Sequence, residues 1–479
     1  MGTHRVSARD LIASIADPDS VESWDSPIDV SGYSEQYQRD IERAKERSGC
    51  DESILTGAAT VNGRRVAFIV NEFGFLAGSI GQAAADRIVA AVRRATAERL
   101  PLLASSASGG TRMQEGTPAF VKMIDISRAV TEHKAAGLPY MAYLRHPTTG
   151  GVFASWGSLA HVTVAEPGAL VGFLGPKVYE LLNGRTFPTG VQQSENLAEH
   201  GIIDAVATAE ELPMLIERAL AVLCDDPSTP RLVRRDRREP SSVDHTWESI
   251  LRTRSTGRAG VRDVLRTACD SFLPMHGTDE GERESAIIVA LARLDGVGCV
   301  IIGQDRAAQS PDAAMGPGAL REARRGMKIA QELNLPLVSF IDTPGAELSA
   351  EAEEGAIAGE IARCIAAMSS LTVPTVSVLL GQGTGGGALA LLPAKVTIAA
   401  EHSWLSPLPP EGASAIVHGH IDAANEMAVQ QRVSAVEMWR AGIVRALVPE
   451  FDDDSPSELA RAVAGEVSFW LRELVAGRA

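Results

Sequence analysis

The chain repeats one pattern of residues, and this internal repeat limits its possible folds more than any other feature. Three landmarks of the first half recur after 235 residues: Leu100-Pro101-Leu102 as Leu335-Pro336-Leu337, Leu138-Pro139 as Val373-Pro374, and Thr149-Gly150-Gly151 as Thr384-Gly385-Gly386. Self-similarity at one spacing is the signature of a duplicated structural unit. A length of 479 residues leaves room for two such units. The sequence therefore predicts two related domains in tandem.

Within each half, short apolar runs alternate with longer helical patterns. The first half predicts strands at 64–70, 100–105 and 140–144, separated by helices at 83–100 and 120–137. The second half predicts strands at 296–303, 335–342 and 375–380, separated by helices at 319–334 and 354–369. Strands that are apolar on both faces and alternate with helices indicate a parallel sheet covered on both sides. The predicted fold class is α/β.

The boundary between the two units is predicted from a change of composition. Residues 225–245 contain prolines and many charges but no apolar period. We therefore expect domains at 1–225 and 246–479, joined by a linker at 226–245. The linker arginines are either part of a solvated connection or a contact for the phosphates of CoA or for an acidic carrier. These arginines are Arg231, Arg234, Arg235, Arg237 and Arg238.

Charge and cysteine content exclude several classes of function. A formal net charge of −16 would repel nucleic acid over most of the surface. The five cysteines lie far apart and form no C-x-x-C pair, so we expect no metal site and a reduced, cytoplasmic protein. No apolar stretch is long enough for a membrane span, and the first twenty residues do not look like a secretory signal.

Two glycine-rich turns are the strongest candidates for chemistry. Gly150-Gly151 and Gly385-Gly386-Gly387 each follow a predicted strand and precede a predicted helix. Glycine permits close approach of a ligand to the main chain, and a helix start offers N–H groups without intrahelical partners. Such turns can bind an anion or an oxyanion. The alternative is a tight turn that serves packing alone, but its recurrence in both halves favours the functional interpretation.

A third segment, SASGGTRMQEG at 106–116, also places glycines after a predicted strand. Gly109, Gly110 and Arg112 could meet an anionic group there, although a surface arginine in a plain loop is the alternative. The matching segment of the second half, IDTPGAELS, has a different sequence. This divergence after duplication suggests that the two halves handle different ligands.

No side-chain constellation competes with these turns. The sequence contains no G-x-S-x-G elbow, no H-E-x-x-H and no phosphate-binding lysine motif. His146 and His161 are expected to be structural, and Glu115, Glu347 and Glu411 to be solvated or to cap helices. Chemistry by main-chain amides is the interpretation that remains.

At these residues the sequence resembles a known family. The first half resembles the β subunit of the bacterial acetyl-CoA carboxylase carboxyltransferase through SASGGTRMQEG, through GLPYMAYLRHPTTGGVFASWGSLAHVTVAEPGALVGFLGPKV and through FPTGVQQSENLAEHGIIDAV. The second half resembles the α subunit through ARLDGVGCVIIG, LPLVSFIDTPGAE, GQGTGGGALALLPAKV and LSPLPPEGASAI. The resemblance covers roughly residues 55–450. It implies two tandem crotonase-like domains, each a ββα superhelix, in a homo-oligomer of six chains (a hexamer) with sites between protomers.

The resemblance also implies a reaction and the roles of residues. Acyl-CoA would bind the first domain, where Gly150 and Gly151 would hold the enolate oxygen and Gly109, Gly110 and Arg112 would contact substrate. Carboxybiotin would approach the second domain, where Gly386 and Gly387 would hold its ureido oxygen beside Gly385. The ureido nitrogen left by decarboxylation would remove the α-proton, so no protein base is required. Leu389 is expected to line the pocket and favour a small apolar acyl group.

Other components are implied by what the sequence lacks. There is no Met-Lys-Met biotinylation site and no ATP-binding domain, so biotin would arrive on a separate biotin carboxyl carrier protein, charged by a biotin carboxylase subunit. The expected products are malonyl- or methylmalonyl-CoA, as for fatty acid biosynthesis. Alternatives are a biotin-dependent decarboxylase of the same superfamily and an inactive oligomeric scaffold.

Two departures from the family pattern stand out. The four-cysteine zinc ribbon of the bacterial β subunit is absent, and the fusion of both halves is instead like the single-chain β subunits of propionyl-CoA and other acyl-CoA carboxylases. IDTPGAELS also lacks the aromatic residue expected after its glycine.

Overall fold

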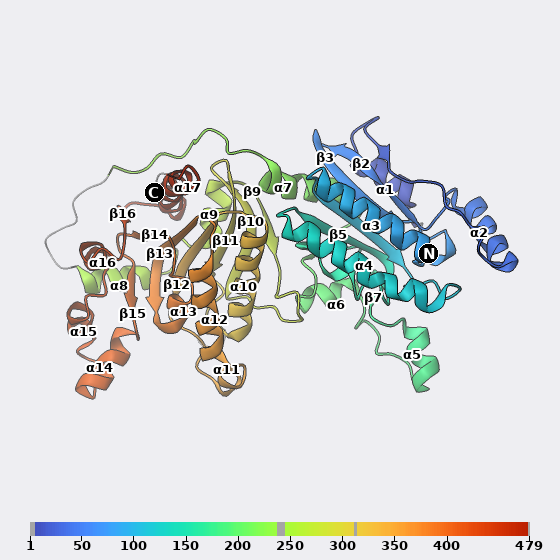
Figure 1. Cartoon of the computed structure of the whole chain (residues 1–479). Coiled ribbons are helices and arrows are strands. Elements are labelled where there is room, and N and C mark those ends of the chain that lie inside the picture. Colours follow the sequence, from blue (N-terminus) through green and yellow to red (C-terminus); the bar gives the residue numbers. More distant parts are fainter. Residues whose placement is uncertain (1–4, 237–244, 311–313, 478–479) are drawn as a thin grey trace. The chain divides into compact units, whose positions relative to one another are not determined.

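The computed structural model describes residues 5–236, 245–310 and 314–477, and it divides into two compact units. The first unit comprises the chain up to residue 220 together with 279–281, and the second comprises 221–278 and 282–479 (Figure 1). Each unit is built on one eight-stranded mixed sheet.

The sheet of the first unit begins with an antiparallel hairpin and continues with parallel strands. Its order is β1-β2-β3-β4-β5-β6-β8, with β7 also pairing with β5. The strands are β1 (Glu22–Ser23), β2 (Ile54–Val61), β3 (Arg64–Asn71), β4 (Leu102–Ser108), β5 (Tyr140–Thr149), β6 (Val162–Ala165), β7 (Val171–Gly172) and β8 (Ala205–Val206). Asn62 and Gly63 both have positive φ and join β2 to β3, as the Asn-Gly pair favours in a two-residue hairpin.

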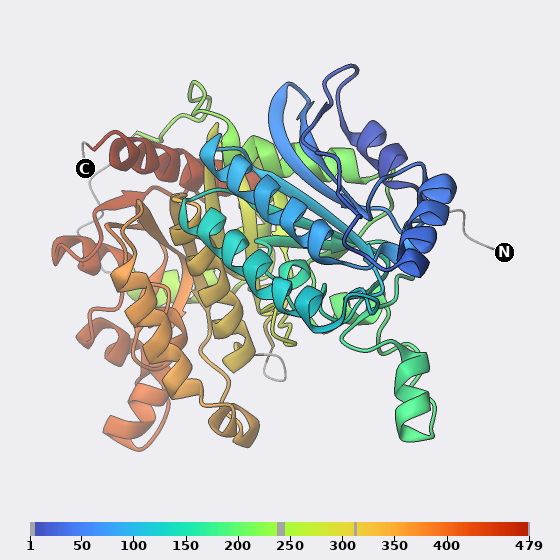
Figure 2. The ribbon, with the colours of Figure 1, turned by 45° about the vertical axis from the view of Figure 1, so that its right-hand side comes forward.

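Helices alternate with these strands along the chain. They are α1 (Ala8–Ile15), α2 (Glu35–Ser48), α3 (Gln82–Ala97), α4 (Gly116–Ala135), α5 (Pro176–Asn183), α6 (Ser194–Glu199) and α7 (Leu212–Cys224), with short 3₁₀ turns at Leu76–Gly78 and Trp156–Ser158. The long helices α3 and α4 lie side by side over one face (Figures 1 and 2). Their apolar residues, such as Ile88 and Ile126, share one core with Ile69 and Tyr140 of the strands.

The second unit repeats this plan. Its sheet order is β16-β14-β13-β12-β11-β10-β9, with β15 also pairing with β13. The strands are β9 (Cys269–Met275), β10 (Ile287–Leu294), β11 (Val297–Gln304), β12 (Leu337–Thr343), β13 (Thr375–Thr384), β14 (Val396–Ala400), β15 (Trp404–Ser406) and β16 (Ala446–Val448). The helices are α8 (Thr246–Arg254), α9 (Val261–Ala268), α10 (Pro317–Glu332), α11 (Ala350–Glu354), α12 (Ile357–Ser370), α13 (Gly385–Leu389), α14 (Pro410–His418), α15 (Ala424–Gln430), α16 (Ala435–Arg440) and α17 (Pro456–Val475).

Both faces of the second sheet are covered. Helices α9 and α17 pack together, and their apolar residues share a core with Val338, Phe340 and Val378. On the opposite face, Gly326 of α10 lies so close to Val289 and Ile302 that a Cβ there would be 2.9 Å from Val289. The predicted α/β class, with two tandem crotonase-like domains, is confirmed.

The duplication extends to backbone pairing at the ends of the central strands. Ser108 of β4 pairs with Thr148 of β5, and Thr343 of β12 pairs with Gly383 of β13. Beyond the strands, isolated parallel bridges join Ile80 to Thr111 and Met315 to Ala346. All four positions are displaced by 235 residues, so the two predicted sites stand on equivalent scaffolds.

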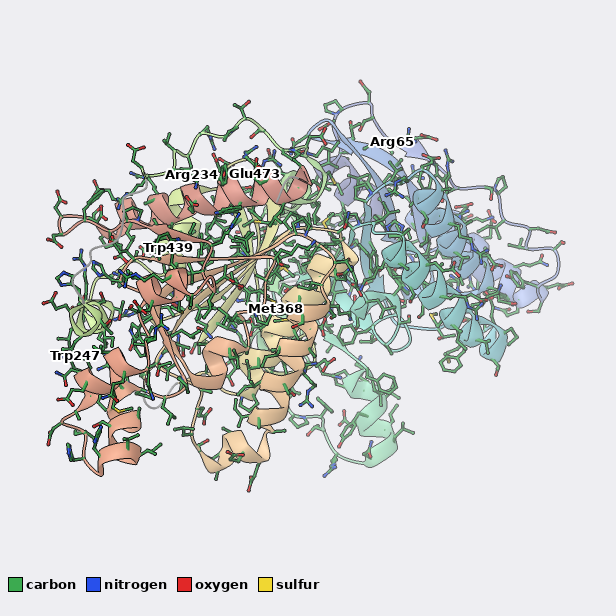
Figure 3. All side chains as sticks on the ribbon, turned by 60° about the vertical axis from the view of Figure 1, so that its left-hand side comes forward. Arg65, Arg234, Trp247, Met368, Trp439 and Glu473 are labelled. Carbon is green, nitrogen blue, oxygen red and sulfur yellow. The ribbon has the colours of Figure 1, made fainter. Side chains whose placement is uncertain are left out.

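The arginines of the predicted linker are bound to the second unit. Arg234 forms a bidentate ion pair with Glu466 of α17 and lies over the Phe469 ring. Figure 3 labels Arg234 near helix α17. Arg235 pairs in the same way with Asp454, and Arg231 pairs with Asp270. Arg234 and Arg235 therefore differ from both a solvated connection and a phosphate contact, because carboxylates of the second unit already neutralise them, whereas Arg231 is largely exposed. The rest of the predicted linker, with Arg237 and Arg238, lies outside the described residues.

None of the helices in the described part of the chain combines the length and the apolar character needed to cross a bilayer.

Candidate active site

The first glycine-rich turn follows β5 and lies against the loop that follows β4. Gly150 has φ +66°, and its N–H donates to the carbonyl of Phe173 at 3.0 Å. Gly110 has φ +105°, and a Cβ there would lie 3.4 Å from the Thr149 oxygen and 3.7 Å from the Gly151 nitrogen. The positive φ of both residues therefore favours glycine at 110 and 150.

Two main-chain amides at this contact lack a protein acceptor among the residues that the structure describes. The Gly110 carbonyl accepts from the Ile80 N–H at 2.9 Å, so the Thr111 N–H on the other side of the same trans peptide points away from Ile80. Within the described residues, neither Thr111 N–H nor Gly151 N–H donates to a protein acceptor. N–H groups without a protein acceptor on two adjacent loops are the kind of donor that can stabilise an oxyanion.

The second glycine-rich turn has the same construction. Gly385 has φ +62° and begins α13 directly after β13. A Cβ on Gly387 would lie 3.2 Å from the nitrogen of Ala346, in the loop after β12. The first N–H groups of a helix have no intrahelical acceptor, so Gly386 and Gly387 present amides next to Ala346.

The structural repeat equates the two turns with a shift of one residue from the predicted pairs. Gly150 and Gly385 share the positive φ, so Gly151 corresponds to Gly386. Gly387 therefore corresponds to Val152, and the predicted second pair, Gly386 and Gly387, starts one residue later than the first pair. The positive φ belongs to Gly150 and Gly385 and not to Gly151 or Gly387.

Thr111 and Ala346 were not among the predicted site residues. Each follows a glycine with positive φ, Gly110 and Gly345 respectively. A glycine of this conformation turns the next peptide away from the strand direction. In the sequence, only these two glycines point to the amides of Thr111 and Ala346.

Arg112 is directed into the protein and not toward a ligand. Its side chain is 1% exposed and donates to Glu52 at 2.9 Å, to the Ser79 carbonyl at 2.6 Å and to Tyr37 at 3.2 Å. Burial lowers the pKa of Arg112, but the hydrogen bonds to Glu52 outweigh burial and raise the pKa above its ordinary value. This placement differs from the predicted contact with an anionic ligand, because the buried Glu52 carboxylate already pairs with the guanidinium.

Other predicted residues divide between the turns and the scaffold. The Gly109 N–H donates to the Ala77 carbonyl at 3.1 Å and is not free for a ligand. Leu389 lies on α13 with 46% of its surface exposed. Glu115 caps α3 by accepting from the Gln82 N–H at 2.6 Å, and the His161 ring accepts from the Tyr140 N–H. The structure thus brings together Gly110, Gly150 and Gly151 in one unit and Gly385–Gly387 in the other.

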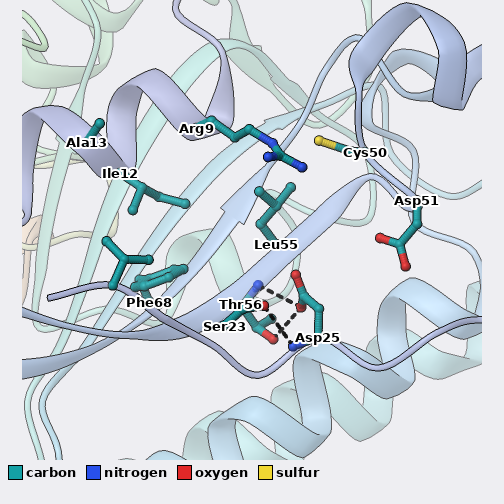
Figure 4. A pocket seen from close by; sticks show the side chains of 11 residues that line it. Arg9, Ile12, Ala13, Ser23, Asp25, Cys50, Asp51, Leu55, Thr56 and Phe68 are labelled. Carbon is teal, nitrogen blue, oxygen red and sulfur yellow. Dashed lines mark hydrogen bonds between the residues drawn. The ribbon is translucent and has the colours of Figure 1, made fainter. Parts of the chain in front are cut away.

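A separate cavity of about 400 Å³ lies in the first unit between α1 and the hairpin strands (Figure 4). Ile12, Leu55 and Phe68 form its apolar wall, and Arg9 and Cys50 lie at one end. None of the predicted site residues lines it.

Solved structures share this architecture. The chain superposes with a TM-score of 0.75 and 21% identity on transcarboxylase 12S, covering 97% of this chain and 90% of that one. It also matches a single-chain, multi-domain long-chain acyl-CoA carboxylase with a TM-score of 0.76 and 18% identity, covering 97% of this chain and 46% of the other. Both likenesses concern the fold.

Sequence comparisons go further. A relative from Mycobacterium bovis, described as a probable biotin-dependent acyl-coenzyme A carboxylase beta3 subunit, is 52% identical over 97% of this chain and 94% of its own length. The acetyl-coenzyme A carboxylase carboxyl transferase subunits beta/alpha of Saccharopolyspora erythraea are 34% identical over 93% of this chain and 81% of their length. The model of the carboxyl transferase domain matches residues 22–468. The chain therefore belongs to the carboxyl transferase domain family and is a biotin-dependent carboxyltransferase of the acyl-CoA carboxylase type.

Proposed function

We propose that this protein transfers a carboxyl group from carboxybiotin on a separate carrier protein to the α-carbon of a short acyl-CoA. The observation that carries the proposal is the paired arrangement of unpartnered main-chain amides, Thr111 with Gly151 and Ala346 with Gly386 and Gly387. Each pair suits an oxygen on which negative charge develops. A reaction that forms an enolate on one substrate and charges a ureido oxygen on the other needs two such sites.

The first unit is assigned to acyl-CoA and the second to biotin. Removing the α-proton of a thioester moves negative charge onto the carbonyl oxygen, and the amides of Thr111 and Gly151 would donate to that oxygen. Carboxybiotin supplies the carboxyl group and, after losing it, a ureido nitrogen basic enough to accept the α-proton. The amides of Ala346, Gly386 and Gly387 would donate to its ureido oxygen. One preorganised donor of this kind is typically worth about 10²–10³ in rate.

The assignment of acyl-CoA to the first unit and of biotin to the second rests on the family resemblance and on the different loops after β4 and β12. SASGGTR in the first unit and IDTPGA in the second stand on equivalent strands but differ in sequence. On this assignment residues 1–225 form the acyl-CoA domain, 226–245 the linker and 246–479 the biotin domain.

The expected substrates are acetyl- or propionyl-CoA, which would give malonyl- or methylmalonyl-CoA. Support comes from the acetyl-coenzyme A named for the Saccharopolyspora relative and from the methylmalonyl-coenzyme A bound in the transcarboxylase structure. The five free cysteines suit a reducing compartment, which supports the cytoplasm as the place of the reaction.

The proposed reaction also requires partner proteins. The chain lacks a carrier lysine motif, so a biotin carboxyl carrier protein and a biotin carboxylase subunit would supply carboxybiotin. A homo-oligomer, a hexamer by the resemblance, would complete the sites. Helix α5 has no buried residue and exposes Leu181 by 84% and Leu182 by 73%, and its repeat counterpart α14 exposes Ile416 by 73%. Apolar helices of this kind mark contact surfaces, and we assign them to the pairing of the first unit of one chain with the second unit of another.

The test is a transfer assay with the purified chain, a biotinylated carrier protein, an ATP-dependent biotin carboxylase and a panel of acyl-CoAs. We expect ATP-dependent carboxylation of short acyl-CoAs that requires the carrier. Decarboxylation of malonyl- or methylmalonyl-CoA without ATP-driven synthesis would favour the decarboxylase instead. A correctly assembled protein that shows neither reaction would favour the scaffold.

A further inference from the structure

Gln304, the last residue of β11, joins the two loops of the second turn through a buried side chain. Its Oε1 accepts from the Asp342 N–H at 3.0 Å, and its Nε2 donates to the Gly387 carbonyl at 2.8 Å. The residue is 1% exposed, so water does not compete for these bonds. One carboxamide thus ties the end of β12 to the first turn of α13.

The loop that leads to Ala346 is held from the same side. Gln309 donates to the Asp342 carbonyl at 3.1 Å and accepts from the Thr343 hydroxyl at 2.7 Å. That hydroxyl in turn accepts from the Gly345 N–H at 3.1 Å. Asp342, Thr343 and Gly345, on the way to Ala346, are therefore each held by a hydrogen bond.

The Asp342 carboxyl adds a third tie, from β12 to β13. Its Oδ1 accepts from the Gln382 N–H at 2.9 Å, and a Cβ on Gly381 would lie 2.5 Å from Oδ1, so only glycine allows this approach. Its Oδ2 has no hydrogen-bond partner within the described residues and lies 3.8 Å from the Arg306 guanidinium.

The first unit has no equivalent of this arrangement. Asn71 ends β3 as Gln304 ends β11, but its Nδ2 donates to the carbonyls of Ser53 and Gly78, which belong to neither site loop. Ala107 stands at the position of Asp342. The first unit has equivalent strands without these hydrogen bonds. The hydrogen bonds of Gln304 and Asp342 therefore point to a requirement of the second site alone.

We propose that Gln304 is a positioning residue for the biotin subsite, holding the amides of Gly387 and Ala346 at the separation that one ureido oxygen requires. The proposal rests on the proposed function of this site. By fixing the carbonyl of Gly387, Gln304 fixes the first turn of α13 relative to the loop after β12. A misplacement of about 1 Å in such a site can cost about 10²-fold in rate.

The first test is Gln304→Met, which keeps the length of the side chain and removes both hydrogen bonds. The assay is transfer from methylmalonyl- or malonyl-CoA to biocytin, so that neither carrier nor carboxylase is required. We expect kcat to fall about 10- to 100-fold and the KM for biocytin to rise, with the KM for acyl-CoA unchanged. If the wild-type chain itself shows no transfer, the proposed function fails. If the wild-type chain is active and Gln304→Met matches it, only the proposal for Gln304 fails.

The second test is Gln304→Glu, which separates positioning from mere packing. An ionised carboxylate cannot donate to the Gly387 carbonyl, whereas a protonated carboxyl can donate there and still accept from the Asp342 N–H. The charged groups nearby are Asp342 and Asp305, which oppose ionisation, and Arg306 and Arg258, which favour it. The activity of Gln304→Glu relative to wild type should rise severalfold from pH 8 to pH 6, while the relative activity of Gln304→Met stays flat.

Gln331→Met is the matched control. Gln331, on α10, also joins two segments: it donates to the Thr372 hydroxyl at 2.8 Å and accepts from the Thr372 N–H at 2.9 Å. Unlike Gln304, it is exposed, and its partner Thr372 lies before the start of β13. Its loss should leave transfer unchanged. A folded Gln304→Met with wild-type kcat and biocytin KM would overturn the proposal. If this variant does not fold, a pH-independent ratio for Gln304→Glu would overturn it instead.

Discussion

A Cβ atom on Gly387 would lie 3.2 Å from the main-chain nitrogen of Ala346, so these two residues, 41 positions apart in the chain, approach each other at van der Waals distance. In the first unit the two loops meet at other residues: a Cβ on Gly110 would lie 3.7 Å from the Gly151 nitrogen, and one on Gly151 would lie 3.3 Å from Thr111 Oγ1. Each candidate oxyanion site is thus made by two loops: Thr111 and Gly151 lie on different loops in the first unit, and Ala346 lies on a different loop from Gly386 and Gly387 in the second. Disturbing one loop contact at a time should therefore affect one substrate at a time.

Gly151→Val and Gly387→Val should damage different substrates. The effect is one of space, because a Cβ at 151 meets Thr111 Oγ1 at 3.3 Å and one at 387 meets Ala346. Both variants should lose transfer by at least about 10²-fold. Calorimetry should show weaker acyl-CoA binding for Gly151→Val and nearly unchanged binding for Gly387→Val. Gly32→Val, where nothing lies within 4 Å, is the control. The opposite pattern would reverse the assignment of substrates to the two units.

The purified chain should carry no biotin. The reason is the missing Met-Lys-Met motif around an acceptor lysine. A streptavidin blot of the chain, made beside a biotinylated carrier protein as the positive control, should be blank at about 50.6 kDa. A strong signal at that mass would contradict the division of labour between this chain and its carrier.

Assembly should depend on the apolar surface of α5. Leu182→Glu places a charge on a helix that has no buried residue in the single chain, and it should therefore leave each unit folded. Sedimentation should show a smaller species, and activity should fall together with assembly. Val233→Glu, at a position 83% exposed outside that helix, should leave both unchanged. A fully active monomer at assay concentration would be incompatible with sites shared between protomers.

Arg112→Met should destabilise the first unit. The change leaves the Glu52 carboxylate buried without its guanidinium partner, and both side chains are at most 4% exposed. Removing one member of a buried pair costs about 3–5 kcal/mol in the free energy of unfolding. Urea unfolding followed by circular dichroism measures it, and adding Glu52→Leu should restore much of the loss. A ligand-binding role would instead appear as weaker acyl-CoA binding at unchanged stability.

Asp342 should make stability depend on pH. Burial raises the pKa of this carboxyl from 3.8 to about 6, whereas Arg306 and the Gln382 N–H act in the opposite direction. Between about pH 4 and 6 the folded state therefore binds more protons than the unfolded state, and stability falls as pH rises through this window. The stability of Asp342→Asn relative to wild type should increase from pH 5 to pH 7, by up to about 2 kcal/mol. A pH-independent difference in urea unfolding would contradict the raised pKa.

The order of strands, turns and helices was predictable because it depends on local sequence patterns that occur in both halves. Apolar runs at 140–144 and 375–380 predicted β5 and β13, which in the structure extend to Thr149 and Thr384, and glycines at 150 and 385 predicted a sharp turn after each strand. Glycine has such positional meaning because positive φ excludes most other residues. The α/β class, the two units and the family were all predicted from these signals.

The candidate site was only partly predictable. The glycines of both turns were found, but the donor residues Thr111 and Ala346 carry no side-chain signal, since any residue has an amide. Arg112 was predicted beside a ligand from its place after Gly109-Gly110, and its true partner Glu52 lies on a segment with no visible relation to it.

The sequence alone determined the duplication, the strand–turn–helix order and the glycines, because each depends on interactions between residues close in the chain. Tertiary structure alone decided which amides stay unpaired, that Arg112 is neutralised internally, and that Gln304 clamps Asp342 to Gly387. The physical reason is that a hydrogen bond or ion pair between distant segments depends on the distance at which folding leaves them. That distance is a property of the packed strands and not of any one stretch of sequence.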